Sequence, residues 1–239
     1  MNVLITGASG KLGSELVKTF LKRGDRVYGI GRKAGAENLA SMAGNANFKY
    51  TACDVASWQE SGETLKIIMK DFIPDIVLFC AGQAFDDIDA QGIKVAKTIE
   101  NFDVNLFGIL YWIEPLLPVF LKRGRGVFAC VSSMSVFKEN HARRIGYSAS
   151  RAALNKLFEN LRLEYLGSGV KFIVFNMGRM TDLKATLGIT YVHAARKIAN
   201  IVNLESVPNK TYNIPLSQYV ATRITALVPD AWYVRFIRK

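Results

Sequence analysis

Histidine and cysteine are scarce in this chain of 239 residues, which contains two of the former and three of the latter. Cys53, Cys80 and Cys130 each end an apolar, strand-like run, with no CxxC spacing and no histidine close by in the sequence. Isolated thiols of this kind form neither a zinc site nor a disulfide framework. We therefore expect buried free thiols, a reducing compartment and no metal centre.

Long apolar runs, linkers, repeats and low-complexity segments are also lacking. The longest apolar region, Phe107–Leu121, contains Glu114, Pro115 and Pro118, so we expect it to be too short and too broken to cross a bilayer and to form a buried helix instead. The first residues are typical of a strand rather than of a signal peptide. The sequence therefore predicts one cytoplasmic domain over residues 1–239.

The chain opens with a strand, a glycine-rich turn and a helix. The apolar run Asn2–Thr6 leads into a turn with Gly7, Gly10 and Gly13, and a helical pattern follows over Ser14–Lys22. Such glycines permit the tight turn, the approach of a pyrophosphate and close packing of helix on strand, while the helix N-terminus offers N–H groups to phosphate. The motif indicates a dinucleotide site, with a purely structural turn as the alternative.

Basic residues follow the second expected strand, Arg26–Ile30. At this point a dinucleotide fold contacts the adenosine ribose, where an acidic residue takes a 2′-hydroxyl and a basic one accommodates a 2′-phosphate. Arg32 and Lys33 therefore favour NADP(H) over NAD(H), with Lys11 as a third candidate cation. NAD(H) stays open as the alternative, as does the view that these are solvated surface charges.

Strand-like and helical patterns alternate along the rest of the chain. Further strands are expected at 48–53, 76–80, 126–132, 170–176 and 211–214, and helices at 57–71, 94–122 and 147–166. This alternation predicts an α/β fold of the doubly wound Rossmann type, with a mostly parallel sheet of about seven strands and helices on both faces. Ligands of such folds bind beyond the carboxyl ends of the strands.

Tyr147 and Arg151 lie one helical turn apart in the segment YSASR. On one helix face a permanent cation could lower the pKa of the phenol and prepare it for proton transfer. The spacing alone is equally that of an ordinary surface pair.

Together these features resemble the short-chain dehydrogenase/reductase family over nearly the whole chain. The TGxxGxxG spacing from Thr6 to Gly13 is nearest that family's extended and atypical branches. The resemblance implies that an aspartate after the third strand binds adenine and that a threonine after the sixth strand contacts the nicotinamide carboxamide. The implied cofactor-binding residues are Thr6, Gly7, Ser9, Gly10, Lys11, Leu12, Gly13, Arg32, Lys33, Asp54, Val55, Ala81, Gly82, Gly178 and Thr181.

The resemblance also implies the catalytic residues Tyr147, Ser133 and Asn105. Arg151 replaces the lysine that in the family binds the ribose, lowers the tyrosine pKa and joins the proton relay. Two further departures are Cys80, where many members have asparagine, and Asn176-Met177-Gly178, which lacks the family's proline after the sixth strand. Because arginine keeps its charge but does not readily release a proton, we expect a weakened or rerouted relay.

The implied activity is hydride transfer between a nicotinamide and a carbonyl or secondary alcohol. The alternative is a catalytically weak or inactive dinucleotide-binding sensor or scaffold of the same fold. The formal net charge of +11 favours an anionic substrate, phosphorylated or linked to a nucleotide or carrier. Arg143 and Arg144, between Ser133 and Tyr147, are candidate substrate ligands or simply a solvated loop.

Two segments bear on partners. A short substrate lid is expected at about 181–203, and the C-terminal segment at about 217–239 carries aromatic residues beside basic ones. The latter suits a helix on an anionic membrane surface, a subunit contact or a tail folded on its own core. The resemblance implies a homodimer or homotetramer. Nucleic acid is not expected, because the basic residues are scattered and no aromatic-basic strand motif occurs.

Overall fold

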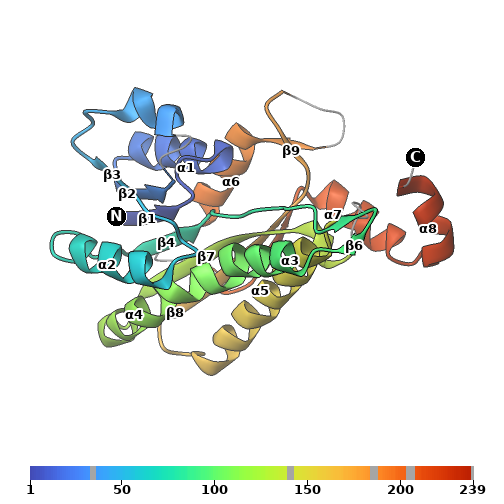
Figure 1. Cartoon of the computed structure of the whole chain (residues 1–239). Helices are drawn as coiled ribbons and strands as arrows, with labels where there is room; N and C mark the ends of the chain where they lie inside the picture. Colours follow the sequence, from blue (N-terminus) through green and yellow to red (C-terminus); the bar gives the residue numbers. More distant parts are fainter. Residues whose placement is uncertain (33–35, 139–142, 184–187, 203–207, 238–239) are drawn as a thin grey trace.

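A seven-stranded parallel sheet forms the centre of the protein (Figure 1). The computed structural model describes residues 1–32, 36–138, 143–183, 188–202 and 208–237. The strand order is β11-β8-β7-β4-β1-β2-β3. The strands are β1 (Asn2–Thr6), β2 (Arg26–Gly31), β3 (Phe48–Ala52), β4 (Ile76–Phe79), β7 (Gly126–Ser133), β8 (Val170–Met177) and β11 (Thr211–Ile214). The predicted doubly wound α/β fold is confirmed.

Helices cover both faces of the sheet, which explains the nearly continuous apolar runs of its strands. α1 (Lys11–Lys22) and α6 (Tyr191–Ile201) pack on one face, while α2 (Trp58–Ile68), α4 (Gly108–Arg123) and α5 (Ile145–Glu164) pack on the other. In β1, neighbouring Leu4 and Ile5 belong to opposite faces, and both are fully buried.

The longest helix runs continuously from α3 (Val95–Phe102) through a π-helical turn (Asp103–Phe107) into α4. By length and composition alone the run Val95–Arg123 could cross a membrane, although Trp112, Leu116 and Phe120 on it are fully buried in the core. The expected buried helix is confirmed, and Pro115 and Pro118 lie inside α4. Packing against the sheet holds the helix despite the two backbone hydrogen bonds that these prolines cannot make.

Shorter elements surround the carboxyl ends of the strands. They are η1 (Ala36–Met42), the hairpin β5 (Ile88–Asp89) and β6 (Gly92–Ile93), η3 (Met134–Val136), and the pair β9 (Met180–Thr181) and β10 (Ile189–Thr190). α6 buries Ala194, Ala195 and Ile198 and packs on α1, so it is a core helix. Within the lid expected at about 181–203, β10 and α6 occupy residues 189–201, and residues 184–187 and 203 lie outside the described residues. The chain continues into α7 (Leu216–Thr225) and α8 (Asp230–Ile237), which extends away from the body (Figure 1).

Candidate active site

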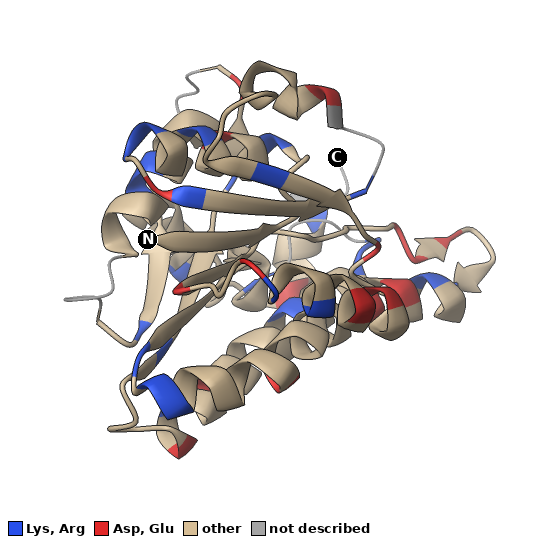
Figure 2. Ribbon diagram, turned by 90° about the vertical axis from the view of Figure 1, so that its left-hand side faces the viewer, with Lys and Arg blue, Asp and Glu red and all other residues tan. Residues whose placement is uncertain are grey.

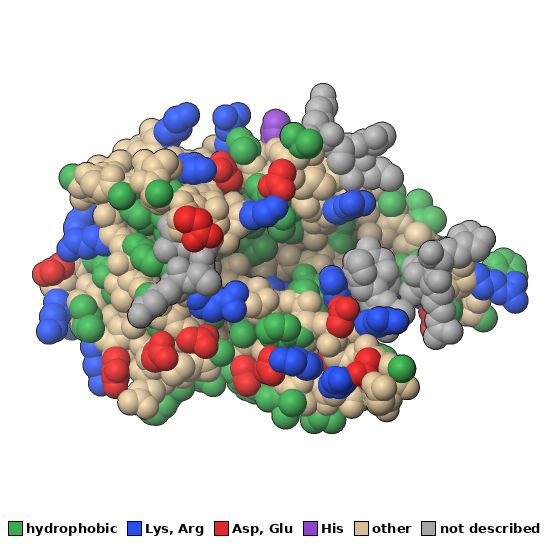
Figure 3. Space-filling view, turned by 45° about the horizontal axis from the view of Figure 1, so that its top comes forward, with side chains coloured by type: hydrophobic (Ala, Val, Ile, Leu, Met, Phe, Trp, Pro, Cys, Tyr) green, Lys and Arg blue, Asp and Glu red, His purple; other side chains and the backbone are tan. Residues whose placement is uncertain are grey.

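A cavity of about 550 Å³ lies at the carboxyl ends of β1, β2, β3 and β4. This volume suits a small-molecule or cofactor site. Figure 3 looks onto a hollowed face whose rim carries basic and acidic side chains. The lining includes eight of the predicted cofactor residues, namely Gly7, Ser9, Gly10, Arg32, Asp54, Val55, Ala81 and Gly82.

The glycine turn lies so close to its neighbours that side chains are excluded. Gly7 has φ +68°, and a Cβ on it would lie 2.5 Å from the backbone nitrogen of Ala81. A Cβ on Gly13 would lie 2.1 Å from the Gly7 carbonyl oxygen. The turn therefore presents bare backbone to the cavity at the start of α1, as phosphate binding requires.

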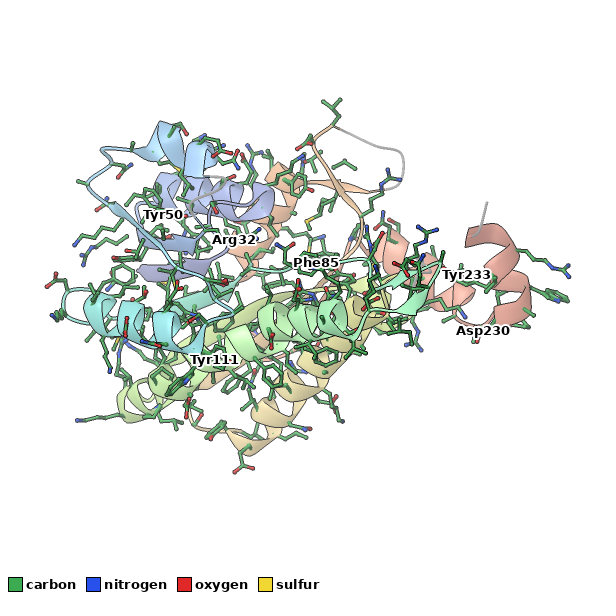
Figure 4. The ribbon with its side chains drawn as sticks, in the orientation of Figure 1. Arg32, Tyr50, Phe85, Tyr111, Asp230 and Tyr233 are labelled. Carbon is green, nitrogen blue, oxygen red and sulfur yellow. The ribbon has the colours of Figure 1, made fainter. Side chains whose placement is uncertain are left out.

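Among the described residues that line the cavity, one is basic, and it is Arg32. With the Gln83 amide oriented so that its oxygen faces the guanidinium, that oxygen accepts from Nη2 at 2.8 Å and from Nη1 at 3.0 Å. Arg32 follows β2 and Gln83 follows β4, and β1 lies between these two strands. The hydrogen bonds between Arg32 and Gln83 therefore cross the carboxyl end of β1. The Tyr50 hydroxyl donates to the Arg32 carbonyl oxygen at 2.7 Å and fixes the backbone, and burial raises the pKa of Tyr50. Figure 4 labels Arg32, Tyr50 and Phe85 around this part of the sheet.

The two other predicted cations are placed differently. Lys11 Nζ lies 2.6 Å from Asp182 Oδ2, on the side of β1 away from Arg32, and its hydrogen bond with Asp182 raises the pKa of Lys11. Lys33 lies outside the described residues. Carboxylates also reach the cavity, since Glu100 and Asp103 form part of its wall. Figure 2 shows the acidic residues gathered around α3 and the neighbouring hairpin.

Two asparagines one turn apart hold the segment that follows β4. Asn105 Oδ1 accepts from the Gln83 N–H at 2.9 Å, and its Nδ2 donates to the Gln83 carbonyl at 2.9 Å and to Ser150 Oγ at 3.0 Å. Asn101 makes the corresponding pair of bonds with the backbone of Phe85. Both N–H groups of the Asn105 amide are thus engaged, so any water relay at this residue must use its oxygen atoms.

Arg151 is a buried cation, 6% exposed. Its Nη1 donates to the Val131 carbonyl at 3.0 Å, and its Nη2 packs so closely on Gly82 that a Cβ there would lie 2.0 Å away. The guanidinium carbon lies 5.4 Å from the centre of the Tyr147 ring. Nε is buried and has no hydrogen-bond partner among the described residues. Leaving such a donor unpaired costs about 1–3 kcal/mol, which is typical of a site that awaits a ligand.

Tyr147 and Cys80 lie beside this arginine, and Ser133 follows its partner Val131 on β7. Ser133 ends β7 two residues after Val131, and its Oγ accepts from the Ser135 N–H at 3.1 Å. Ser150 Oγ donates to the Tyr147 carbonyl at 2.9 Å, which links Asn105 to the tyrosine backbone. Burial raises the pKa of Cys80 to about 12 although the nearby guanidinium opposes this, so the thiol in the cavity wall stays protonated at neutral pH.

Asp87 is a structural determinant of the site that sequence reasoning missed. It is fully buried, and its carboxylate accepts from the N–H groups of Ile145 at 2.9 Å and Gly146 at 2.6 Å and from the Thr98 hydroxyl at 3.1 Å. It therefore caps α5 from a distant segment, one residue before Tyr147, where a negative charge suits the helix dipole. No local pattern could have found it, because Asp87 and the two capped residues are 58 and 59 positions apart.

The remaining predicted residues are not among the described residues that line the cavity. Gly178 N–H donates to the Ile214 carbonyl at 2.7 Å, and Thr181 Oγ1 donates to the Leu183 carbonyl at 2.6 Å. Arg143 is exposed, while Arg144 Nε is held by Asp86 Oδ1 at 2.8 Å. Thr6, Leu12 and Gly13 are buried behind the loop. Within the part of the chain that the structure describes, no cluster of three or more metal-ligating side chains occurs.

Comparison with known proteins agrees with this geometry. A family model described as short chain dehydrogenase matches residues 1–192. An uncharacterized oxidoreductase of Staphylococcus aureus (strain MW2) is 29% identical over 185 residues, which cover 77% of this chain and 79% of that relative. A similar one from Staphylococcus epidermidis (strain ATCC 12228 / FDA PCI 1200) is 27% identical over 189 residues, 79% of this chain and 81% of the relative. The chain therefore belongs to the short-chain dehydrogenase family of oxidoreductases.

Solved structures share the fold. The closed form of serine dehydrogenase complexed with NADP⁺ aligns with a TM-score of 0.80 at 21% identity, over 91% of this chain and 96% of that one. Serine dehydrogenase from Escherichia coli gives 0.78 at 22%, over 91% and 99%. ElxO with NADP bound gives 0.79 at 18%, over 92% and 100%. At these identities the likeness establishes the fold alone.

Replacing Asp87 should loosen the helix end that carries Tyr147. Asp87→Ala leaves the buried Gly146 N–H and the partly buried Ile145 N–H unpaired, so we expect the free energy of unfolding to fall by about 1–3 kcal/mol, measured by urea denaturation. Asp86→Ala is the matched control, since this neighbouring carboxylate is exposed and its ion pair with Arg144 contributes about 0–1 kcal/mol. Equal losses in the two variants would contradict the capping role.

Proposed function

We propose that this chain is an NADP(H)-dependent reductase or dehydrogenase that acts on the carbonyl or secondary alcohol of a small anionic substrate. The observation that carries the proposal is the arrangement of Arg151, fixed to Val131 beside Gly82 with one buried N–H left unpaired and the Tyr147 ring against it. The guanidinium is a suitable donor group for a ribose hydroxyl. The bare backbone at Gly7 and the cavity volume also fit a dinucleotide.

The chain's own groups have distinct parts in this proposal. When bound, the nicotinamide supplies or accepts a hydride. In reduction, the Tyr147 hydroxyl donates a proton to the oxygen that becomes the alcohol. Since Ser135 N–H occupies a lone pair of Ser133 Oγ, the Ser133 hydroxyl hydrogen is free to donate to the same substrate oxygen. Asn105 holds the Gln83 segment and, through Ser150, the backbone of Tyr147.

The preference for NADP(H) rests on Arg32. Its guanidinium already lies in the cavity and donates to Gln83, a neutral amide that a 2′-phosphate can displace because charge-assisted hydrogen bonds are stronger. The bound NADP in two of the solved relatives agrees with this assignment. The anionic substrate is proposed from the net charge of +11 and from Arg143 and Arg144, which directly precede the first turn of α5.

Arg32→Ala should weaken NADPH binding by roughly 10–100-fold and leave NADH binding nearly unchanged. The reason is that only NADPH carries the 2′-phosphate that the guanidinium would bind. Isothermal titration with both nucleotides measures the two affinities. Arg32→Lys keeps the charge without the planar fork, so its affinity for NADPH should lie between those of the wild type and Arg32→Ala. Equal losses for NADPH and NADH would contradict the assignment.

Arg151→Lys should lower kcat by roughly tenfold or more, although it restores the residue common in the family. A lysine ammonium is a single point donor, and it does not reproduce both the Val131 hydrogen bond and the contact with Gly82. NADPH oxidation with a panel of phosphorylated and neutral carbonyls measures turnover. A rise in kcat would show instead that the wild-type site lacks a proton relay.

Tyr147→Phe is the control for the catalytic proposal. It should reduce kcat by about 10²–10⁴-fold while NADPH still binds, because only the proton donor is lost. Tight NADPH binding by the wild-type protein without turnover of any carbonyl would replace the catalytic proposal with a cofactor-binding sensor or scaffold.

Arg143→Ala combined with Arg144→Ala should raise KM for an anionic carbonyl by roughly 10–100-fold and leave KM for a neutral aldehyde unchanged. Arg125→Ala is the matched control, because Arg125 is exposed at the opposite, amino-terminal end of β7. An unchanged KM for every anionic substrate in the double variant would refute the role of these arginines.

A further inference from the structure

The C-terminal helices present an apolar surface to solvent. Leu216, Val220, Ile224 and Leu227 are spaced four, four and three residues apart, which places them on one side of α7 and its end. Their exposed fractions lie between 47% and 84%, and Trp232 on α8 is 65% exposed. We call these five residues the C-terminal stripe. It lies beyond residue 192, where the match to the family model ends.

The helices that carry the C-terminal stripe are anchored through other residues. Gln218 Oε1 accepts from the Arg179 N–H at 2.6 Å, and the Tyr219 ring lies edge-on to Phe137 at 5.3 Å. Lys138, which follows η3, holds α8. It forms an ion pair with Asp230 of α8 and lies 4.8 Å from the centre of the Tyr233 ring on the same helix. Figure 4 shows Asp230 and Tyr233 on the arm at the right of the molecule. Because these contacts hold α7 and α8 in place, the stripe is a fixed outward surface.

The sequence that carries the C-terminal stripe is mainly positive. After Leu216 it contains Arg223, Arg235, Arg238 and Lys239 but only one acidic residue, Asp230, which is bound by Lys138. Of these basic residues Arg238 and Lys239 lie outside the described residues, and the Arg223 guanidinium lies 5.4 Å from the centre of the Phe137 ring. Arg235 follows Trp232 by three residues on α8, and both are exposed, so an indole and a guanidinium lie on the same side. The whole chain carries a formal charge of +11.

The combination of apolar stripe and positive charge decides between possible occupants. A second copy of the chain would cover the apolar side chains but would bring two strongly positive molecules together. The surface of an anionic bilayer accepts both features, since aliphatic and indole groups enter the boundary between headgroups and acyl chains while basic residues stay among the phosphates.

We propose that α7 and α8 dock the protein on the surface of an anionic lipid bilayer through the C-terminal stripe. Two residues that anchor α7, Phe137 and Arg179, lie just after strands of the sheet. Phe137 is four residues past the end of β7 at Ser133, and Arg179 is two residues past the end of β8 at Met177. Docking therefore holds the substrate side of the candidate active site next to the membrane. The inference does not depend on the cofactor or on turnover, because it concerns lipid binding alone.

Vesicle flotation of the full chain tests this proposal. The protein should float with phosphatidylcholine vesicles that contain phosphatidylglycerol, bind at least roughly tenfold more weakly to phosphatidylcholine alone, and be released from the anionic vesicles by added salt. Trp232 emission should shift to the blue on binding, and Trp232→Phe should abolish that shift. Failure of the wild-type protein to bind anionic vesicles would overturn the proposal.

A paired set of variants distinguishes lipid binding through the C-terminal stripe from nonspecific adsorption through any exposed apolar side chain. Ile224→Ser with Leu227→Ser should weaken binding to anionic vesicles by roughly tenfold or more, since two aliphatic side chains no longer enter the bilayer. Leu163→Ser with Leu166→Ser is the matched control and should bind as the wild type does, because these residues of α5 and its end are 68% and 79% exposed on another part of the surface. Thermal unfolding checks that both pairs stay folded.

Two outcomes of the variant set would refute the proposal. One is equal vesicle binding by the stripe variant and its control. The other is a change of oligomeric state in the stripe variant, seen by light scattering after gel filtration, together with no vesicle binding by the wild type, which would assign the C-terminal stripe to a second copy of the chain.

Discussion

The hydrogen bond from Arg151 to the Val131 carbonyl connects the sheet to the helix that carries Tyr147. It arises from a difference in strand length. β4 ends at Phe79, opposite Cys130, whereas β7 continues to Ser133, so Val131 lies one residue beyond the last rung of the ladder with β4. A buried carbonyl there needs a donor, and the guanidinium supplies it while remaining next to Gly82 and the Tyr147 ring. The same bond gives a buried cation a polar partner.

Two other buried side chains fix the position of α5 from distant parts of the chain. Asp87 caps the N-terminus of α5, and Asn105 joins the segment after β4 to Ser150. Each acts through hydrogen bonds to backbone groups or to a hydroxyl, whose geometry is narrow. Arg151, Asp87 and Asn105 therefore fix the N-terminal part of α5 by hydrogen bonds, while Leu154 and Phe158 pack the helix into the core. Substitutions at these positions act on the site through helix placement as well as through charge.

Much of the fold could be predicted from the sequence, whereas the site could be predicted only in outline. The strands and helices follow from local periodicity, and the turn from Gly7 to Gly13 follows from glycine, because both signals are contained within a few neighbouring residues. Gln83, Tyr50 and Asp87 were missed because their partners are distant in the chain. The helix expected over 94–122 is present with Pro115 and Pro118 inside it, since packing on the sheet outweighs the local preference of proline.

The sequence by itself determined the parallel sheet, the glycine turn at the start of α1 and the one-turn spacing of Tyr147 and Arg151. Only the tertiary structure decided which charged groups meet. It places Arg32 over the cavity with Gln83 and Lys11 on Asp182, and it anchors α7 and α8 so that the C-terminal stripe faces solvent. The physical reason is that periodicity and glycine act through neighbours in the chain, whereas the partner of a long charged side chain depends on where the sheet brings distant strand ends together.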